Sequence, residues 1–183
     1  MTDPMETERL WIRRHAPSDW ETLYSYLSLP ETYEFEPGEP ISEERARELA
    51  RARAAGEDFL AVVEKSTGTM VGHLYFRKSE PMRFETWELG FILHPAFRNR
   101  GYCTEASAAM VRDAFERRRA HKIVAFCDPR NTASWKVLEK IGMEREGHFR
   151  QKAFFRLDGE GKPLWNDCWA YGILAGGGEA VLA

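Results

Sequence analysis

The sequence contains little cysteine, no long apolar run and no strong net charge. Its three cysteines, Cys103, Cys127 and Cys168, are widely spaced and match no metal-binding pattern, which indicates a reducing, cytoplasmic location. No apolar run approaches the ~20 residues needed to span a bilayer, and the N-terminal stretch MTDPMETE lacks a signal-peptide core. A net charge of -3 gives no support for general nucleic-acid binding. We therefore expect a cytoplasmic protein without a membrane, nucleic-acid or metal partner.

What is present is the composition of a globular domain. The 183 residues fit one domain spanning 1–183, and 43% hydrophobic with 30% charged residues is ordinary for a soluble protein. Periodicity and capping residues predict helices over 17–27, 42–56, 104–119 and 131–142. Strands are predicted over 9–13, 59–64, 71–76, 87–93, 123–126, 143–156 and 164–174. Because helices and strands alternate only in the middle, the pattern indicates a mixed α/β sheet.

One segment in the middle of the chain predicts a phosphate site. The run ELGFILHPAFRNRGYCTEA places an apolar strand before a loop with Arg98, Arg100 and Gly101, and a helix is expected from about Thr104. Such a loop offers backbone N–H groups, the helix dipole favours negative charge, and the arginines add cationic donors. The segment therefore predicts a cofactor that carries phosphate.

A second segment, DPRNTASWKVLEKIGM, suggests which cofactor this is. The spacing Arg98-x-x-Gly101-x-Cys103 resembles the pyrophosphate loop of the GNAT N-acetyltransferases, Q/R-x-x-G-x-G/A. Asn131-x-x-Ser134, followed by EKIGM, resembles the second cofactor motif of that superfamily. The variant NxxSWKVLEKIG looks most like the branch of ribosomal-protein N-terminal (Rim-type) acetyltransferases. The resemblance covers essentially the whole chain and is sharpest over residues 85–145.

The resemblance implies both a fold and a cofactor site. The fold would be a GNAT-like, mostly antiparallel sheet of about seven strands with a splayed central pair, flanked by about four helices. Acetyl-coenzyme A would enter between strands 87–93 and 122–126, where Gly90 would kink the first strand and free the backbone of Phe91, Ile92 and Leu93. The remaining cofactor contacts are expected from Arg98, Asn99, Arg100, Gly101, Tyr102, Cys103, Thr104, Asn131 and Ser134. Asn131 is equally well explained as a helix cap, and Cys103 as a small spacer.

The catalytic groups are less well defined by the sequence. Many members of the superfamily place a tyrosine seven residues after the asparagine to protonate the leaving thiolate, but this chain has Leu138 there. Ser134 or an ordered water would serve instead. Glu88 is the candidate base, with a solvated or salt-bridged strand residue as the alternative, and a backbone N–H near Phe91 or Ile92 is the candidate oxyanion donor. The histidines at 73, 94 and 148 are weaker candidates.

The loop between the first two helices is expected to form the acceptor pocket. Tyr33 and Phe35 would bind the substrate, and four loop acids either attract a cationic amine or are simply solvated: Glu31, Glu34, Glu36 and Glu39. We expect an acetyl-coenzyme A-dependent N-acetyltransferase that acts on a primary amine, such as a protein or peptide N-terminal α-amine. A small-amine or antibiotic acetyltransferase and a noncatalytic acyl-coenzyme A-binding module are the alternatives. The sequence leaves a homodimer open.

Overall fold

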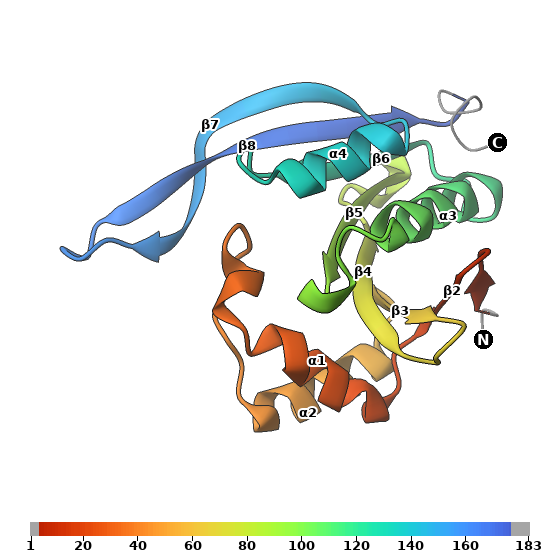
Figure 1. Cartoon of the computed structure of the whole chain (residues 1–183). Coiled ribbons are helices and arrows are strands. Elements are labelled where there is room, and N and C mark those ends of the chain that lie inside the picture. Colours follow the sequence, from red (N-terminus) through yellow and green to blue (C-terminus); the bar gives the residue numbers. More distant parts are fainter. Residues whose placement is uncertain (1–3, 177–183) are drawn as a thin grey trace.

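The computed structural model describes residues 4–176, which form one mixed sheet with helices on both faces (Figure 1). The sheet has eight strands in the order β1-β2-β3-β4-β5-β6-β8-β7. Every neighbouring pair is antiparallel except β5 and β6, which are parallel. The mixed α/β fold with about four helices is confirmed. The additional strand is β1, a two-residue pairing at the sheet edge.

The strands are β1 (Met5–Glu6), β2 (Leu10–Arg14), β3 (Phe59–Glu64), β4 (Met70–Lys78), β5 (Thr86–Leu93), β6 (Lys122–Cys127), β7 (Glu144–Leu157) and β8 (Pro163–Leu174). The α-helices are α1 (Trp20–Leu27), α2 (Glu43–Ala55), α3 (Tyr102–Glu116) and α4 (Thr132–Lys140). Short 3-10 turns occupy η1 (Pro17–Asp19), η2 (Pro30–Tyr33), η3 (Met82–Phe84) and η4 (Pro95–Phe97).

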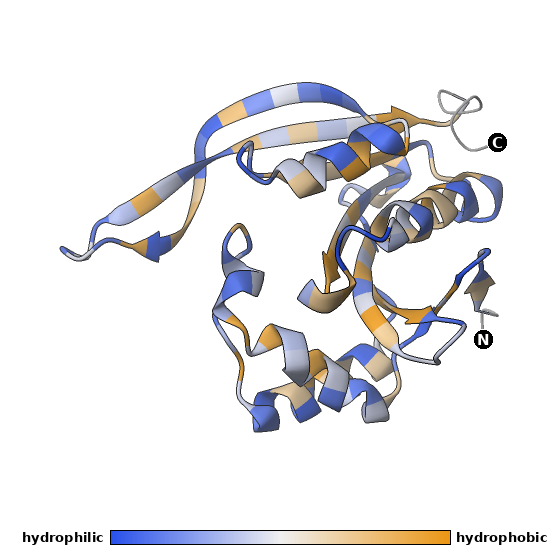
Figure 2. Ribbon diagram, viewed as in Figure 1, coloured by the Kyte–Doolittle hydropathy of each residue, from blue (hydrophilic) through white to orange (hydrophobic). Residues whose placement is uncertain are grey.

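Alternation along the strands divides the interior into two cores. On β3, Leu60 and Val62 point into a core shared with α3 and α4, whereas Ala61 and Val63 point into a second core shared with α1 and α2. Successive side chains of a strand face opposite sides of the sheet, so the two helix pairs lie on opposite faces. Figure 2 shows the hydrophobic residues concentrated in these central strands.

Local signals set the helix ends near the site. Ser42 caps α2 by accepting a hydrogen bond from the Arg45 backbone N–H, as its sequence position predicts. Helix α3 begins at Tyr102, two residues before the expected start, because Gly101 adopts a left-handed φ of 81° and serves as its N-cap. Gly142, also left-handed with a φ of 84°, follows the end of α4.

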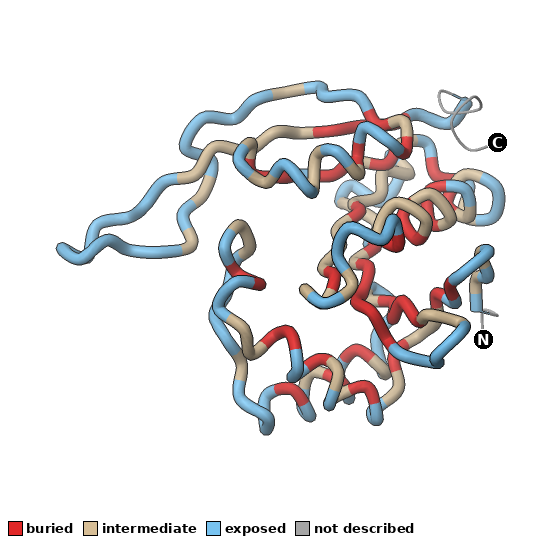
Figure 3. The backbone as a smooth tube through the Cα atoms, in the orientation of Figure 1, coloured by how far each residue is buried: buried red, intermediate tan, exposed pale blue. Residues whose placement is uncertain are grey.

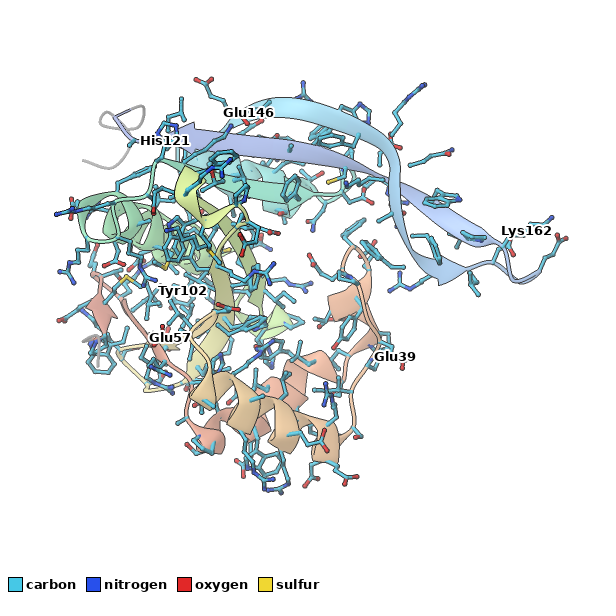
Figure 4. The ribbon with its side chains drawn as sticks, turned by 180° about the vertical axis from the view of Figure 1, so that it is seen from behind. Glu39, Glu57, Tyr102, His121, Glu146 and Lys162 are labelled. Carbon is cyan, nitrogen blue, oxygen red and sulfur yellow. The ribbon has the colours of Figure 1, made fainter. Side chains whose placement is uncertain are left out.

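The β7–β8 hairpin extends beyond the body of the sheet as an exposed arm (Figures 1 and 3). Arg156 ties the arm to the end of η2 and the loop that follows, because it donates hydrogen bonds to the backbone carbonyls of Tyr33 and Glu34. Figure 4 shows that loop, marked by Glu39, on the side of the arm whose tip carries Lys162. The loop and the arm therefore face the same region of the molecule.

Candidate functional site

The two central strands separate partway along their length, as expected. Strands β5 and β6 pair only at Thr86↔Lys122, Trp87↔Ile123 and Glu88↔Val124. Beyond these pairs β5 continues to Leu93 along β4, while β6 continues to Cys127 along β8. Each strand therefore follows the twist of its own outer partner, and a gap opens between them.

The ladder between β4 and β5 determines which backbone groups face this gap. The Ser79 N–H donates to the Thr86 carbonyl at 2.8 Å, and the His94 N–H donates to the Val71 carbonyl at 2.9 Å. In an antiparallel ladder every second residue forms hydrogen bonds to a given neighbouring strand. The backbone N–H and C=O of Ile92 therefore face β4, and those of Phe91 and Leu93 face the gap. The Ile92 backbone, expected to contact the cofactor, does not face the gap.

The expectation of a kink at Gly90 is wrong. The β4–β5 register passes through the Tyr75↔Gly90 pair without interruption, and a Cβ on Gly90 would lie 3.5 Å from Tyr75, which is ordinary contact. The close backbone approach occurs instead at Gly72, where a Cβ would lie 2.4 Å from the Ile92 carbonyl oxygen. The gap arises from the divergence of β4–β5 and β6–β8, so no bulge is needed.

The loop before α3 presents a series of unused backbone donors. Asn99 and Gly101 adopt φ angles of 62° and 81°. Within residues 4–176, the N–H groups of residues 99–104 donate to no protein acceptor. Arg9 supports the loop from behind by donating to the Arg100 carbonyl at 3.0 Å. Free N–H groups at a helix N-terminus beside exposed Arg98 and Arg100 suit an anion such as a pyrophosphate.

Two side chains at the start of α3 have structural roles. Burial raises the pKa of the Cys103 thiol to about 12, so the thiol is protonated at neutral pH, which supports the interpretation as a spacer. Glu105 accepts hydrogen bonds from the Thr7 hydroxyl at 2.6 Å and from the Arg9 backbone N–H at 2.9 Å. These bonds anchor the helix to the N-terminal strands.

Helix α4 borders the gap from the β6 side. The Asn131 side-chain oxygen caps the helix by accepting from the Ser134 N–H at 3.1 Å, which leaves the amide NH₂ as a donor. Ser134 lines a cavity at the end of the gap, and so does Leu138, whose side chain is 1% exposed. The position where many relatives carry a tyrosine is therefore part of an apolar wall.

A cavity of about 590 Å³ lies at the end of the gap. It brings together the expected Glu88, Ser134, Tyr33 and Phe35 with the part of β5 that contains Phe91 and Ile92. The phosphate loop, residues 98–104, lies outside it. Titratable residues that the sequence did not place in a site also line it, among them Arg53, Tyr75 and Lys152.

Of the four acids in the loop, Glu36 is the one that lines this cavity. Burial raises its pKa to about 7. Neither Glu36 nor Glu88 forms an ion pair within the described residues. The other carboxylates of the wall are paired, Asp128 with Arg130 at 2.6 Å and Asp167 with His148 at 2.7 Å.

The histidines have roles other than that of a free base. His73 lines the cavity but is buried, and burial together with Arg53 holds its pKa well below the ordinary value. Its Nδ1 lies 2.5 Å from the Tyr26 hydroxyl. His94 shapes the turn after β5, since its Nδ1 accepts from the Ala96 N–H at 3.1 Å.

None of the helices within 4–176 is long and apolar enough to cross a membrane. No group of three or more His, Cys, Asp and Glu side chains in this part of the chain is arranged to hold a metal ion.

Comparison with known proteins agrees with this geometry. The sequence profile of the acetyltransferase (GNAT) domain matches residues 9–144. An uncharacterized N-acetyltransferase, YnaD of Bacillus subtilis, is 32% identical over 169 residues, which covers 92% of this chain and 95% of YnaD. The crystal structure of a GNAT-family acetyltransferase from Bacillus anthracis superimposes with a TM-score of 0.86 at 32% identity, covering 95% of this chain and 99% of that one.

A more distant structure shares the fold alone. RimL, a ribosomal L7/L12 α-N-protein acetyltransferase solved in complex with coenzyme A, has a TM-score of 0.79 at 18% identity and covers 94% of this chain and 98% of its own. The profile match, the full-length relatives and the splayed strands beside a loop of free N–H groups agree. The chain is an N-acetyltransferase and belongs to the GNAT acetyltransferase family.

Proposed function

We propose that this enzyme transfers the acetyl group of acetyl-coenzyme A to the primary amine of a small molecule bound in the 590 Å³ cavity. One observation carries the proposal. The gap-facing backbone of Phe91 and Leu93 leads from the loop of free N–H groups to a cavity that contains Glu88 and Ser134. Membership of an acetyltransferase family speaks against a noncatalytic binding module.

The residues on either side of the gap would hold the cofactor. The N–H groups of residues 99–104 and the charges of Arg98 and Arg100 suit the pyrophosphate. The backbone of Phe91 and Leu93 and the free amide NH₂ of Asn131 suit the amide-bearing arm. When bound, acetyl-coenzyme A supplies an acyl group activated as a thioester, whose thiol leaving group has an ordinary pKa of about 8.5.

Three groups of the chain would act on the reaction. The Phe91 N–H, which faces the gap, would donate to the carbonyl oxygen as that oxygen gains negative charge. Glu88 would accept a proton from the attacking amine, directly or through water. The Ser134 hydroxyl would orient the departing thiolate or donate a proton to it.

Glu36 is a second candidate to receive the amine proton. A carboxyl with a pKa of about 7 can exchange protons near neutral pH, which suits a general base. Glu88 lies on β5 and Glu36 on the opposite loop, so the two carboxyls approach the cavity from different walls. Both favour a cationic or neutral amine between them.

The shape of the cavity favours a small acceptor over a protein N-terminus. Its volume falls within the range of about 300–1,000 Å³ typical of small-molecule sites. The loop wall that contains Tyr33 is held to the β7–β8 arm by the hydrogen bonds of Arg156, which restricts that side of the cavity. A peptide α-amine is therefore the second candidate.

A panel of amines tests the proposal. Purified enzyme with acetyl-coenzyme A is offered small primary amines and unacetylated peptides, and thiol release is followed together with the mass of the product. Steady thiol release with an acetylated small amine as product is expected. Thiol release that matches hydrolysis without amine, for every compound, would contradict the transferase assignment, and peptides acetylated faster than all small amines would contradict the acceptor class.

A further inference from the structure

Arg53 is a buried cation in the wall of the acceptor cavity. It lies in the last turn of α2 and is 8% exposed, and its side chain lines the cavity. The buried residues of α2 are Ala46, Ala50 and Arg53, so the arginine occupies the inward stripe of the helix, where an apolar residue is the rule. By contrast, Arg51 on the same helix is exposed.

The guanidinium of Arg53 has no counter-charge within the described residues. Its Nε and Nη1 are buried and have no hydrogen-bond partner, and no carboxylate forms an ion pair with it. The ring of Phe59 lies against it, with 4.1 Å from the guanidinium carbon to the ring centre. Aromatic contact stabilises a cation but does not neutralise it.

The polar groups around Arg53 are neutral. Tyr26 is a neighbour of Arg53, and burial raises the pKa of its hydroxyl further above the ordinary value, so it remains a phenol. The imidazole of His73 is neutral as well, because burial and the charge of Arg53 lower its pKa. The Tyr26 hydroxyl and His73 Nδ1 share one hydrogen bond at 2.5 Å, so both polar groups are partnered without carrying a charge.

A buried charge without a partner is strongly unfavourable, and proteins rarely retain one unless something else compensates it. Burial lowers even the pKa of Arg53 itself. Within residues 4–176 no carboxylate pairs with Arg53, and the arginine is one of the residues that line the cavity. The compensation is therefore expected from whatever the cavity binds.

The charges of the cavity wall indicate what that ligand is. Unpaired Glu36 and Glu88 suit an amine, and unpaired Arg53 suits a carboxylate, for which arginine is the preferred partner in low-dielectric sites. We propose that Arg53 binds a carboxylate of the acceptor, so that the acceptor is a small amino acid-like molecule with both an amine and a carboxylate. The acceptor assignment rests on the proposed function, whereas the carboxylate site of Arg53 does not.

Matched substrate pairs test the acceptor. Glycine, β-alanine, 4-aminobutanoate and 6-aminohexanoate are each compared with the corresponding primary amide, as kcat/KM over a pH series that corrects for amine ionisation. At the best chain length, kcat/KM for the carboxylate is expected to exceed kcat/KM for its amide by about 10-fold or more, which corresponds to one charge-assisted contact. Arg53→Met should bring the ratio to about 1 by raising KM for the carboxylate.

The control variant is Arg51→Met, which removes the same charge from the exposed face of α2 and should leave the ratio unchanged. Arg53→Met keeps the length of the side chain and removes a buried charge, so it is expected to fold, and Arg53→Lys, which keeps the charge, should retain part of the preference. A wild-type enzyme that uses the amides as well as the acids, or a ratio unaltered by Arg53→Met, would overturn the proposal. Faster acetylation of peptides with Asp or Glu near the N-terminus would also overturn it.

A binding measurement separates this inference from the proposed function. Butanoate, hexanoate and benzoate, which carry no amine, are titrated into the wild type and both methionine variants by calorimetry at low ionic strength. Binding to the wild type and Arg51→Met but not to Arg53→Met supports the carboxylate site even if no amine is acetylated. Acetylation of amines without any carboxylate binding would instead retain the transferase and refute the site.

Discussion

The raised pKa of Glu36 has a consequence for stability that mutagenesis can measure. In the folded protein this carboxyl titrates at about 7, compared with an ordinary 4.5. Because the folded state binds the proton more tightly than the unfolded state, the charged form opposes folding. The penalty is absent below pH 4.5, grows as the pH rises from 4.5 to about 7, and is constant above that.

The free-energy penalty of ionised Glu36 follows from the difference between its pKa in the folded and unfolded states. A difference of this size corresponds to about 3 kcal/mol at most, and because Glu36 is only half-buried, solvent screening reduces it to about 1–2 kcal/mol. Glu36→Gln keeps the shape and removes the charge. We expect the variant to match the wild type in free energy of unfolding at pH 4 and to exceed it by about 1–2 kcal/mol at pH 8.

Urea unfolding at several pH values, with equal m-values as the test of a common unfolded state, gives this difference directly. Glu34→Gln is the matched control, because Glu34 lies on the same loop, is exposed and does not line the cavity. Its difference from the wild type should be small at every pH. A Glu36→Gln difference that is independent of pH would refute the interpretation that Glu36 is an uncompensated buried carboxyl.

Three further predictions concern the cofactor and the chemistry. Gly101→Val should block coenzyme A binding, because the residue has a φ of 81° and its backbone is part of the loop of free donors. Arg98→Ala should weaken the binding free energy of coenzyme A by only about 1–2 kcal/mol. Unchanged affinity of folded Gly101→Val in calorimetry would exclude this loop as the pyrophosphate site. Ser134→Ala should lower kcat by about 10- to 1000-fold with little change in coenzyme A affinity. If steady-state kinetics give the variant the turnover of the wild type, Ser134 has no role in the reaction. Glu88→Gln should slow acetyl transfer most at pH values where the acceptor amine is protonated. The loss of rate relative to the wild type should shrink as the pH approaches the pKa of the acceptor. Parallel pH–rate profiles for the two proteins would therefore remove Glu88 from the mechanism.

Most of the fold could be predicted because local signals agree with the tertiary structure. The predicted strand over 59–64 is β3 itself, and the predicted helix over 42–56 is α2 with its two caps, Ser42 and Gly56. The start of α3 was placed two residues late, since the sequence does not reveal that Gly101 takes a left-handed conformation. Caps and periodicity define elements, whereas the exact ends depend on backbone angles that a neighbouring loop imposes.

Within the site, the motif residues could be proposed from their spacing in the sequence, whereas Arg53 could not. The stripe Ala46, Ala50 and Arg53 at i, i+4 and i+7 was readable in the sequence. However, α2 is rich in both alanine and arginine, so the small buried face does not stand out from the charged one. Burial of Arg53 depends on packing against Phe59 of β3, a contact between segments that the helix sequence alone cannot indicate.

The sequence of β5 does not indicate which of its backbone groups face the neighbouring strand. Apolar alternation within Thr86–Leu93 gives no information on whether Phe91 or Ile92 directs its N–H toward β4. That phase is set by the partner, through the pairing of Tyr75 with Gly90 and of Gly72 with Leu93. A shift of one residue would exchange the two sets of backbone groups. The close approach of Gly72 to the Ile92 carbonyl therefore matters for function as well as packing, because it holds the register that leaves Phe91 and Leu93 facing the gap.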